Sequence, residues 1–211
     1  MDTVAPFENA HAKLDAQIQS TGHSKWDFVI YRCTYKSDAD WNKMMTKLKE
    51  KDAEPYHMAY FNLTKRLRDS LAYTVFEDAD LEGASKEVVL KRFSDWVESK
   101  PWETEQPQGS RPKSSTRYEI CVMVDEASLQ SVLNEPQDFV PPDMGEWQGK
   151  EEEAGWVYAL RHDPRQHAET EEEEYWWMRI SFFSLMIGWY EVLSDEGWHH
   201  EHSQHPDIAV R

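Results

Sequence analysis

The chain has few cysteines and no long hydrophobic run. Cys33 and Cys121 are the two cysteines among 211 residues, and both lie in apolar, strand-like segments. Two cysteines cannot build the disulfide framework of a small secreted domain, so we expect buried free thiols in a cytoplasmic protein. The longest strongly apolar stretch, 180–189, is about half of the roughly 20 residues that a membrane-spanning helix needs. With no signal-peptide pattern at the N-terminus, we expect no membrane contact.

Catalytic and cofactor motifs are missing as well. The chain contains no Walker loop, no dinucleotide-binding glycine pattern, no G-x-S-x-G elbow and no H-E-x-x-H motif. Its acidic runs lack the alternating oxygen ligands and the glycine of a calcium loop. We therefore expect no cofactor, and the sequence by itself names no reaction.

Basic residues are scarce in the second half of the chain. Segment 118–211 holds 21 of the 40 acidic residues and 5 of the 23 basic ones, whereas 25–117 is nearly neutral. Nucleic-acid binding is disfavoured, because it requires a basic face that neutralises phosphates. Much of the acid falls in two expected loops, 136–155 and 163–175, which are either solvated or a docking surface for a basic protein partner.

Aromatic residues, by contrast, are plentiful, with ten Trp, nine Tyr and eight Phe. Their burial supplies the free energy that orders a chain, so the protein should fold despite its net charge of −17. Segment 1–24 is expected to be an N-terminal arm or a loosely docked helix, followed by a single α+β domain over 25–208.

Hydrophobic periodicity gives the expected elements. Helical spacing of apolar residues predicts helices after Ser37, around Leu67, from Ser85 to Ser99, up to Leu133 and over 185–193. Runs of β-branched and aromatic residues predict strands over 28–35, 118–124, 156–160 and 176–182.

Strands interleaved with helices favour an α+β two-layer sandwich. Our specific expectation is a ferredoxin-like antiparallel sheet with helices mainly on one face. The strands 28–35 and 118–124 are then central neighbours, which brings Cys33 and Cys121 into the same region. The alternative is a mixed α/β sheet with helices on both sides.

Several blocks resemble a widespread family of filamentous-fungal intracellular proteins. They include FVIYRCTY at 28–35, GASK at 83–86 and WWM at 176–178, and the resemblance extends over roughly residues 25 to 208. It implies a fungal origin and a shared fold. Because that family has no established biochemical function, the resemblance implies no catalytic residue.

Charged residues inside the expected strands form the strongest site-like pattern. One interpretation is a polar sheet face with ordinary ion pairs. The other is an open sheet face on which arginine forks bind a small acidic ligand through its carboxylate or phosphate, beside aromatic walls. The candidate ligand-binding residues are Tyr31, Arg32, Glu119, Arg161, Trp177 and Arg179.

Histidines near the C-terminus are candidate metal ligands, because neutral imidazole binds zinc, nickel and copper. A solvated histidine-rich segment is the alternative, since structural zinc sites draw four ligands from a rigid frame. The candidates are His199, His200, His202 and His205.

These patterns favour an acidic intracellular binding or interaction protein without enzymatic activity. The alternative is a small-molecule enzyme whose pocket is formed by the strand arginines and the long loops. A third hypothesis is metal handling through the histidines. Whether the chain forms a homodimer is left open.

Overall fold

The computed structural model contains one mixed sheet in the part of the chain that it describes. The strand order is β2-β1-β3-β4-β5-β6. The strands are β1 (Val29–Arg32), β2 (Val75–Phe76), β3 (Ile120–Val124), β4 (Trp156–Arg161), β5 (Trp177–Ser181) and β6 (Ile208–Ala209). The described residues are 8–53, 64–111, 115–136, 153–162, 176–183, 185–194, 197–203 and 207–209, so most of both expected acidic loops lies outside them.

The pairing of the strands corrects the expected topology. β1 runs parallel to both β2 and β3, and β5 runs parallel to β6, whereas β4 is antiparallel to β3 and β5. Parallel neighbours need long crossover connections, and here helices fill the segments that follow β1 and β2. The α+β class is confirmed, but a ferredoxin-like antiparallel sheet is not. The expectation that 28–35 and 118–124 supply neighbouring strands is confirmed.

The helices expected after Ser37 and from Ser85 begin at Asp38 and Lys86. Asp125 caps one helix by accepting a hydrogen bond from the Ser128 backbone N–H at 2.8 Å, and the Ser128 hydroxyl accepts one from the Asp125 N–H at 2.9 Å. The α-helices are α1 (Glu8–Thr21), α2 (Asp38–Ala53), α4 (Lys65–Ser70), α5 (Lys86–Glu98), α6 (Trp102–Glu105), α7 (Glu126–Asn134), α8 (Tyr190–Val192) and α9 (Gly197–Glu201). Shorter turns are the 3-10 helices η1 (Ala79–Leu81) and η2 (Thr116–Tyr118) and the π-helix η4 (Leu185–Trp189).

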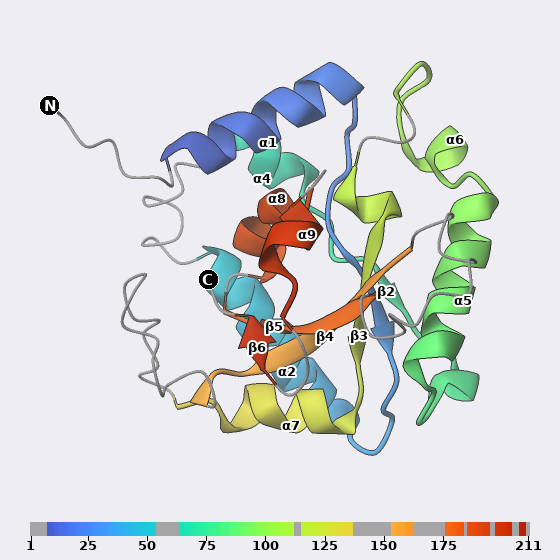
Figure 1. The fold of residues 1–211 in the computed structure, drawn as a ribbon, viewed down its shortest axis with the longest axis vertical. Coiled ribbons are helices and arrows are strands. Elements are labelled where there is room, and N and C mark those ends of the chain that lie inside the picture. Colours follow the sequence, from blue (N-terminus) through green and yellow to red (C-terminus); the bar gives the residue numbers. More distant parts are fainter. Residues whose placement is uncertain are drawn as a thin grey trace, which may run out of the picture.

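Helices cover both faces of the sheet. Figure 1 shows α5 on one side of the strands and α1, α2, α4 and α8 on the other. The alternation along β1 explains this arrangement, because Val29 and Tyr31 pack in a cluster with Phe93 of α5, while Ile30 packs in the opposite cluster with Leu48 of α2. The structure therefore matches the alternative architecture with helices on two sides.

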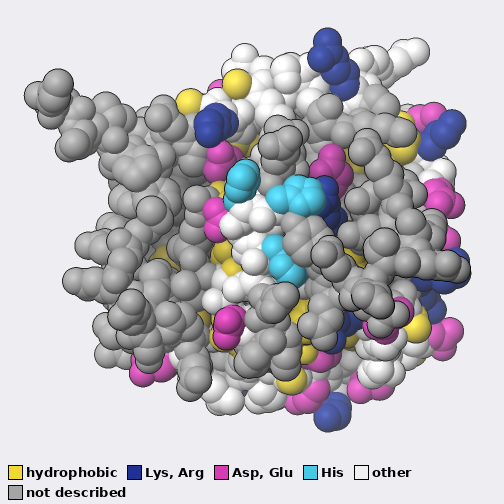
Figure 2. Space-filling view, viewed as in Figure 1, with side chains coloured by type: hydrophobic (Ala, Val, Ile, Leu, Met, Phe, Trp, Pro, Cys, Tyr) yellow, Lys and Arg dark blue, Asp and Glu magenta, His cyan; other side chains and the backbone are white. Residues whose placement is uncertain are grey.

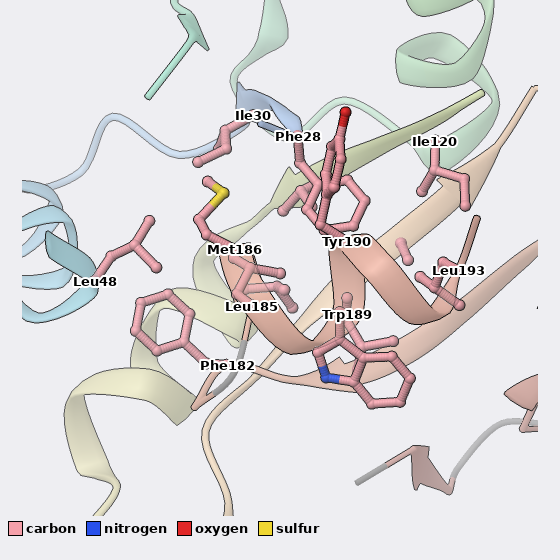
Figure 3. Close-up of a cluster of buried hydrophobic side chains, with 14 of the residues drawn as sticks. Phe28, Ile30, Leu48, Ile120, Phe182, Leu185, Met186, Trp189, Tyr190 and Leu193 are labelled. Carbon is pink, nitrogen blue, oxygen red and sulfur yellow. The ribbon is translucent and has the colours of Figure 1, made fainter. Parts of the chain in front are cut away.

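The larger cluster lies under the C-terminal helices. In Figure 3, Phe28, Ile30 and Ile120 from the sheet region face Met186 and Tyr190 from η4 and α8. Each such side chain contributes about 1.5–3 kcal/mol when it is fully buried. The segment expected as an N-terminal arm also reaches this cluster through α1.

Helix α1 is docked rather than loose. Its Leu14 and Ile18 have exposed fractions of 0% and 4% and belong to the same cluster as Tyr190. Within the described residues, no helix is long and apolar enough to span a membrane.

A buried ion network connects the segments that precede β1 and β3. The Arg117 side chain has no exposed surface, and it pairs with Asp27, which is also fully buried. Its Nε and Nη2 donate hydrogen bonds to the Glu105 carboxylate at 2.8 and 2.9 Å. The network links the segment before β1 to α6 and η2, and all three groups are used in these contacts, which indicates a structural role.

Candidate functional site

The strand arginines do not converge on one site. Arg32 lies on the sheet face that carries Phe28 and Ile30, while Arg179 contacts Trp156 and Tyr158 on the opposite side. A shared binding site for an acidic ligand built from these arginines is therefore absent from the described residues. Arg32, Arg161 and Arg179 instead lie in three separate local environments, each with its own partners.

Arg32 is enclosed and paired at the end of β1. Only 5% of the residue is exposed, and its Nη1 donates to Glu77 Oε1 at 3.1 Å while its Nη2 donates to Asp38. Its guanidinium carbon lies 4.5 Å from the ring centre of Tyr35. Burial opposes the charged form, but the hydrogen bonds to Asp38 and Glu77 outweigh it and raise the pKa of Arg32. Arg32 thus anchors α2 and the end of β2 and has little surface left for a ligand.

Arg179 and the expected Trp177 do lie near each other, with two further aromatic residues. The Arg179 guanidinium lies 4.1 Å from the ring centre of Trp156. Lys86 at the start of α5 lies 4.2 Å from the ring of Trp177 and 4.7 Å from that of Tyr158. Cations over aromatic faces contribute about 0.5–1 kcal/mol at exposed positions. The two contacts of Lys86 attach the start of α5 to β4 and β5.

Arg161 lies at the end of β4, beside α9. Its Nη1 lies 3.2 Å from Nε2 of His199, and its guanidinium carbon is 6.0 Å from the ring centre of Trp198. It therefore contacts the histidine-rich segment rather than Arg32 or Arg179.

Glu119 is not a strand residue. It follows η2, immediately before β3, and its carbonyl accepts a hydrogen bond from the His162 N–H at 2.7 Å. The His162 ring meets Ser94, whose hydroxyl lies 2.8 Å from Nδ1. Because that hydroxyl also donates to the Leu90 carbonyl at 2.8 Å, it accepts from the histidine and is not activated as a nucleophile.

The histidines do not form a metal centre among the described residues. No group of three metal-ligating side chains occurs there. His199 contacts Arg161, and His202 Nε2 lies 3.1 Å from the Trp177 carbonyl. Figure 2 shows histidine side chains gathered where Figure 1 places α9. His200 is exposed, and His205 lies outside the described residues, so its predicted role stays a prediction.

A pocket of about 550 Å³ lies between β2 and α5, and we call it the β2–α5 pocket. Two apolar side chains on β2 and the fully buried Leu81 on η1 form its apolar wall, while charged side chains from α5 and from the residues after β2 supply the rest. Its volume lies within the range of about 300–1,000 Å³ that small-molecule sites occupy. The lining residues are Tyr31, Val75, Phe76, Glu77, Asp78, Leu81, Arg92 and Asp95.

Tyr31 carries the one hydroxyl among these lining residues. The residue is 1% exposed, and the hydroxyl has no hydrogen-bond partner among the described residues. Its ring meets Phe76 and Phe93 edge-on, at centroid distances of 5.2 and 6.4 Å. Burial raises the pKa of the Tyr31 phenol, so the hydroxyl stays protonated and is able both to donate and to accept.

The mouth of the pocket is charged. Arg92 Nη1 donates to Asp78 Oδ2 at 2.5 Å, and this hydrogen bond lowers the pKa of the Asp78 carboxyl. Asp95 pairs with Lys91, 2.8 Å away on the same helix, and both side chains of that pair are largely exposed. The pocket thus has an apolar wall with a buried phenol and a mouth with three carboxylates and one guanidinium.

Sequence reasoning singled out Tyr31 but missed the rest of this pocket. Val75 and Phe76 form a two-residue strand, which is too short for an alternation pattern. Arg92 and Asp95 are charged residues of an amphipathic helix, a pattern that by itself indicates only a solvated face. The parallel pairing of β2 with β1 brings Val75 and Phe76 beside Tyr31, and the packing of Phe93 against Tyr31 brings α5 there.

Both cysteines are buried free thiols, as expected. Burial raises the pKa of the Cys33 thiol to about 12 and that of Cys121 well above its ordinary value. Neither is an activated nucleophile, because the reactive form is the thiolate.

Comparisons with known proteins add no relative. No protein-family model matches this chain, and no curated protein or solved structure matches it either. The fold and site therefore define it only as a mixed α/β protein with an edge pocket. The resemblance to a fungal family stays a prediction.

Proposed function

We propose that this protein is an intracellular, non-enzymatic binding protein that holds a small organic ligand in the β2–α5 pocket. The observation that carries the proposal is the buried Tyr31 hydroxyl without a partner in a pocket wall. More than about 90% of buried polar groups in native proteins have a hydrogen-bond partner. A ligand with a polar atom at Tyr31 supplies that partner once the side chains over the hydroxyl move, because the hydroxyl is buried in the protein without ligand.

The volume of the pocket supports a small ligand rather than a protein segment. It is about 550 Å³, within the range of small-molecule sites, and four of the eight lining residues are charged, which suits a ligand with a polar group and an apolar body. Val88 is the one large hydrophobic residue among the described residues that is exposed, at 46%. The described surface thus supplies no broad apolar patch for a protein partner.

The chemistry of the lining favours binding over catalysis. A carboxyl group that acts as a general acid needs a raised pKa, whereas Arg92 lowers that of Asp78. The Tyr31 phenol has a raised pKa and is a poor base at neutral pH. An enzyme using the strand arginines and the long loops is less well supported, because Arg32 and Arg179 lie on opposite faces of the sheet.

The acidic loops are a separate proposal. On sequence grounds, 136–155 and 163–175 are either solvated or a docking surface for a basic protein partner, and we propose the docking surface as the second candidate. That interaction is compatible with a ligand in the β2–α5 pocket and does not depend on it.

A thermal-shift screen of a metabolite library tests the proposed function. It uses the unmodified protein, Asp95→Trp, which places a large ring at the pocket mouth, and Val88→Trp as a control on the same helix outside the pocket. We expect ligands that raise the melting temperature of the unmodified protein and of Val88→Trp but not of Asp95→Trp. Hits that stabilise all three proteins equally, or no hit at all, would overturn the proposal.

A further inference from the structure

We infer that the β2–α5 pocket selects a small organic cation, namely an amine with an apolar body. This inference rests on the proposed function and adds the charge of the ligand to it. Four features carry it: the balance of charges around the mouth, the weak pairing of Asp95, the apolar wall and the buried phenol of Tyr31.

Carboxylates outnumber cations around the pocket. Arg32 shares its guanidinium between Glu77, which lines the pocket, and Asp38. Arg92 pairs with Asp78 and also feels the charge of Asp80. Each guanidinium is therefore flanked by two carboxylates, and the mouth keeps a negative potential that attracts cations.

Asp95 is the carboxylate best placed to receive an ammonium group. Its present partner, Lys91, has a side-chain exposed fraction of 75%, and Asp95 itself has 59%. Exposed ion pairs on a helix contribute little to stability, so the ammonium group of a ligand readily replaces Lys91. Lys91 does not line the pocket, whereas Asp95 does.

The lining of the pocket does not suit a metal ion as the bound cation. Val75, Phe76 and Leu81 offer no ligating atom, and no cluster of three metal ligands occurs among the described residues. Apolar contact with these side chains instead favours an organic group of the size of a phenyl ring.

An anionic ligand fits less well. Arg92 is the cation that lines the pocket, and it already donates to Asp78. A carboxylate ligand would have to displace Asp78 and approach Glu77 and Asp95 as well. Like charges at such distances oppose binding.

Tyr31 marks the inner end of the proposed site. Tyr31 lines the same pocket as Arg92 and Asp95, so its phenol and the charged mouth belong to one cavity. A ligand that spans the pocket can therefore place its ammonium group at Asp95 and a second polar atom at the Tyr31 hydroxyl. Arylalkyl amines with a ring hydroxyl have this arrangement of groups.

Three probes with the same ring and different charge test the inference. Tyramine is the cation, para-ethylphenol is neutral, and para-hydroxyphenylpropionate is the anion. We expect calorimetry to show that tyramine binds at least about tenfold more tightly than para-ethylphenol and that the anion binds most weakly. The advantage of tyramine should shrink as ionic strength rises from about 0.05 to about 0.5 M.

Two variants with the same change of charge locate the cation. Asp95→Asn should weaken tyramine binding about three- to tenfold and leave para-ethylphenol unchanged, whereas Glu98→Gln, on the same helix but outside the pocket, should change neither. Equal effects of the two variants, or tighter binding of the neutral or anionic probe, would contradict the inference.

The screen separates this inference from the proposed function. Pocket-dependent library ligands that are neutral or anionic, with no binding of tyramine, overturn the cation preference and leave the binding function in place. Absence of any pocket-dependent ligand overturns both.

Discussion

Arg117 and Asp27 form an ion pair in which neither side chain has any exposed surface. Asp27 also accepts a hydrogen bond from the Thr74 backbone N–H, at 2.6 Å, so the pair connects the segments that precede β1, β2 and β3. Two buried charges are stable only while both are present, because an unpaired buried charge has lost its hydration without compensation.

Arg117→Met should therefore lower the free energy of unfolding by about 3–5 kcal/mol. The reason is the loss of the partner for Asp27 and Glu105, not the loss of apolar packing. Urea unfolding followed by tryptophan fluorescence measures the change. Lys65→Met is the matched control, because the paired side chains of Lys65 and Asp69 have exposed fractions of 80% and 59%. This variant should lower the free energy of unfolding by less than about 0.5 kcal/mol. Similar losses for the two variants would contradict the structural role of the buried pair.

Two glycines should respond oppositely to the same pair of substitutions. A Cβ at Gly155 would lie 2.8 Å from the Cα of Val132 in α7, so the obstacle is steric and grows with side-chain size. Gly83 has a φ of +66° and no atom within 4 Å of an added Cβ, so its obstacle is backbone conformation. Asparagine adopts positive φ more readily than alanine does.

We therefore expect Gly155→Asn to be less stable than Gly155→Ala, which itself should cost about 1–3 kcal/mol. At Gly83 the order should reverse, with Gly83→Asn more stable than Gly83→Ala. Thermal unfolding of the four variants gives the ranking. If the alanine and asparagine variants ranked in the same order of stability at both positions, one constraint would explain both glycines, and the distinction between a steric and a conformational constraint would be wrong.

Local sequence signals predicted the long elements well. The strand 118–124 and the helix ending near Ser99 correspond to β3 and α5, because the first contains a continuous run of apolar residues and apolar residues recur at helical spacing along the second. The short β2 and the parallel pairings were missed. Their formation depends on contacts between distant segments, such as Ile30 with Val75, which no local pattern contains.

The candidate site was only partly predictable, because a charged residue in a strand has the same local pattern whether it is exposed or paired. Arg32 looked available in the sequence, yet Asp38 and Glu77 enclose it. Tyr31 was a candidate only as an aromatic wall beside the arginines, whereas its significance comes from the absence of a hydrogen-bond partner among the described residues. That property depends on every side chain packed around it.

Removing the Tyr31 hydroxyl should not destabilise the protein without ligand. Tyr31→Phe eliminates a buried polar group that has no partner among the described residues, so the free energy of unfolding should stay equal or rise by up to about 1 kcal/mol. Tyr118→Phe is the control, because the Tyr118 hydroxyl donates to Glu105 at 2.7 Å and accepts from Gln106 at 2.9 Å. It should cost about 1–3 kcal/mol. A loss for Tyr31→Phe as large as that for Tyr118→Phe would mean that its hydroxyl is already satisfied, and the argument for a ligand would fail.

The two buried thiols should make stability fall at alkaline pH. In the unfolded chain a thiol ionises near pH 8.5, whereas burial raises the pKa of Cys33 to about 12 in the folded protein. Below about pH 8.5 the thiol is protonated in both states and pH has no effect. Above it the unfolded state binds fewer protons than the folded state, so the free energy of unfolding decreases, by up to about 1.4 kcal/mol per pH unit for each thiol.

Unfolding in urea at about pH 8, 9 and 10 measures this slope, and a Cys33→Ala/Cys121→Ala variant identifies its source. The variant should start less stable, because two buried sulfur atoms are lost, but its stability should decline less steeply between pH 9 and 10. Buried tyrosines such as Tyr190, whose pKa burial raises to about 12, contribute only at the upper end of that range, since an unfolded tyrosine ionises near pH 10. An unchanged slope in the variant would show that the thiols ionise in the folded protein. In that case Ellman's reagent would label them at pH 8 without denaturant, whereas we expect labelling only after unfolding.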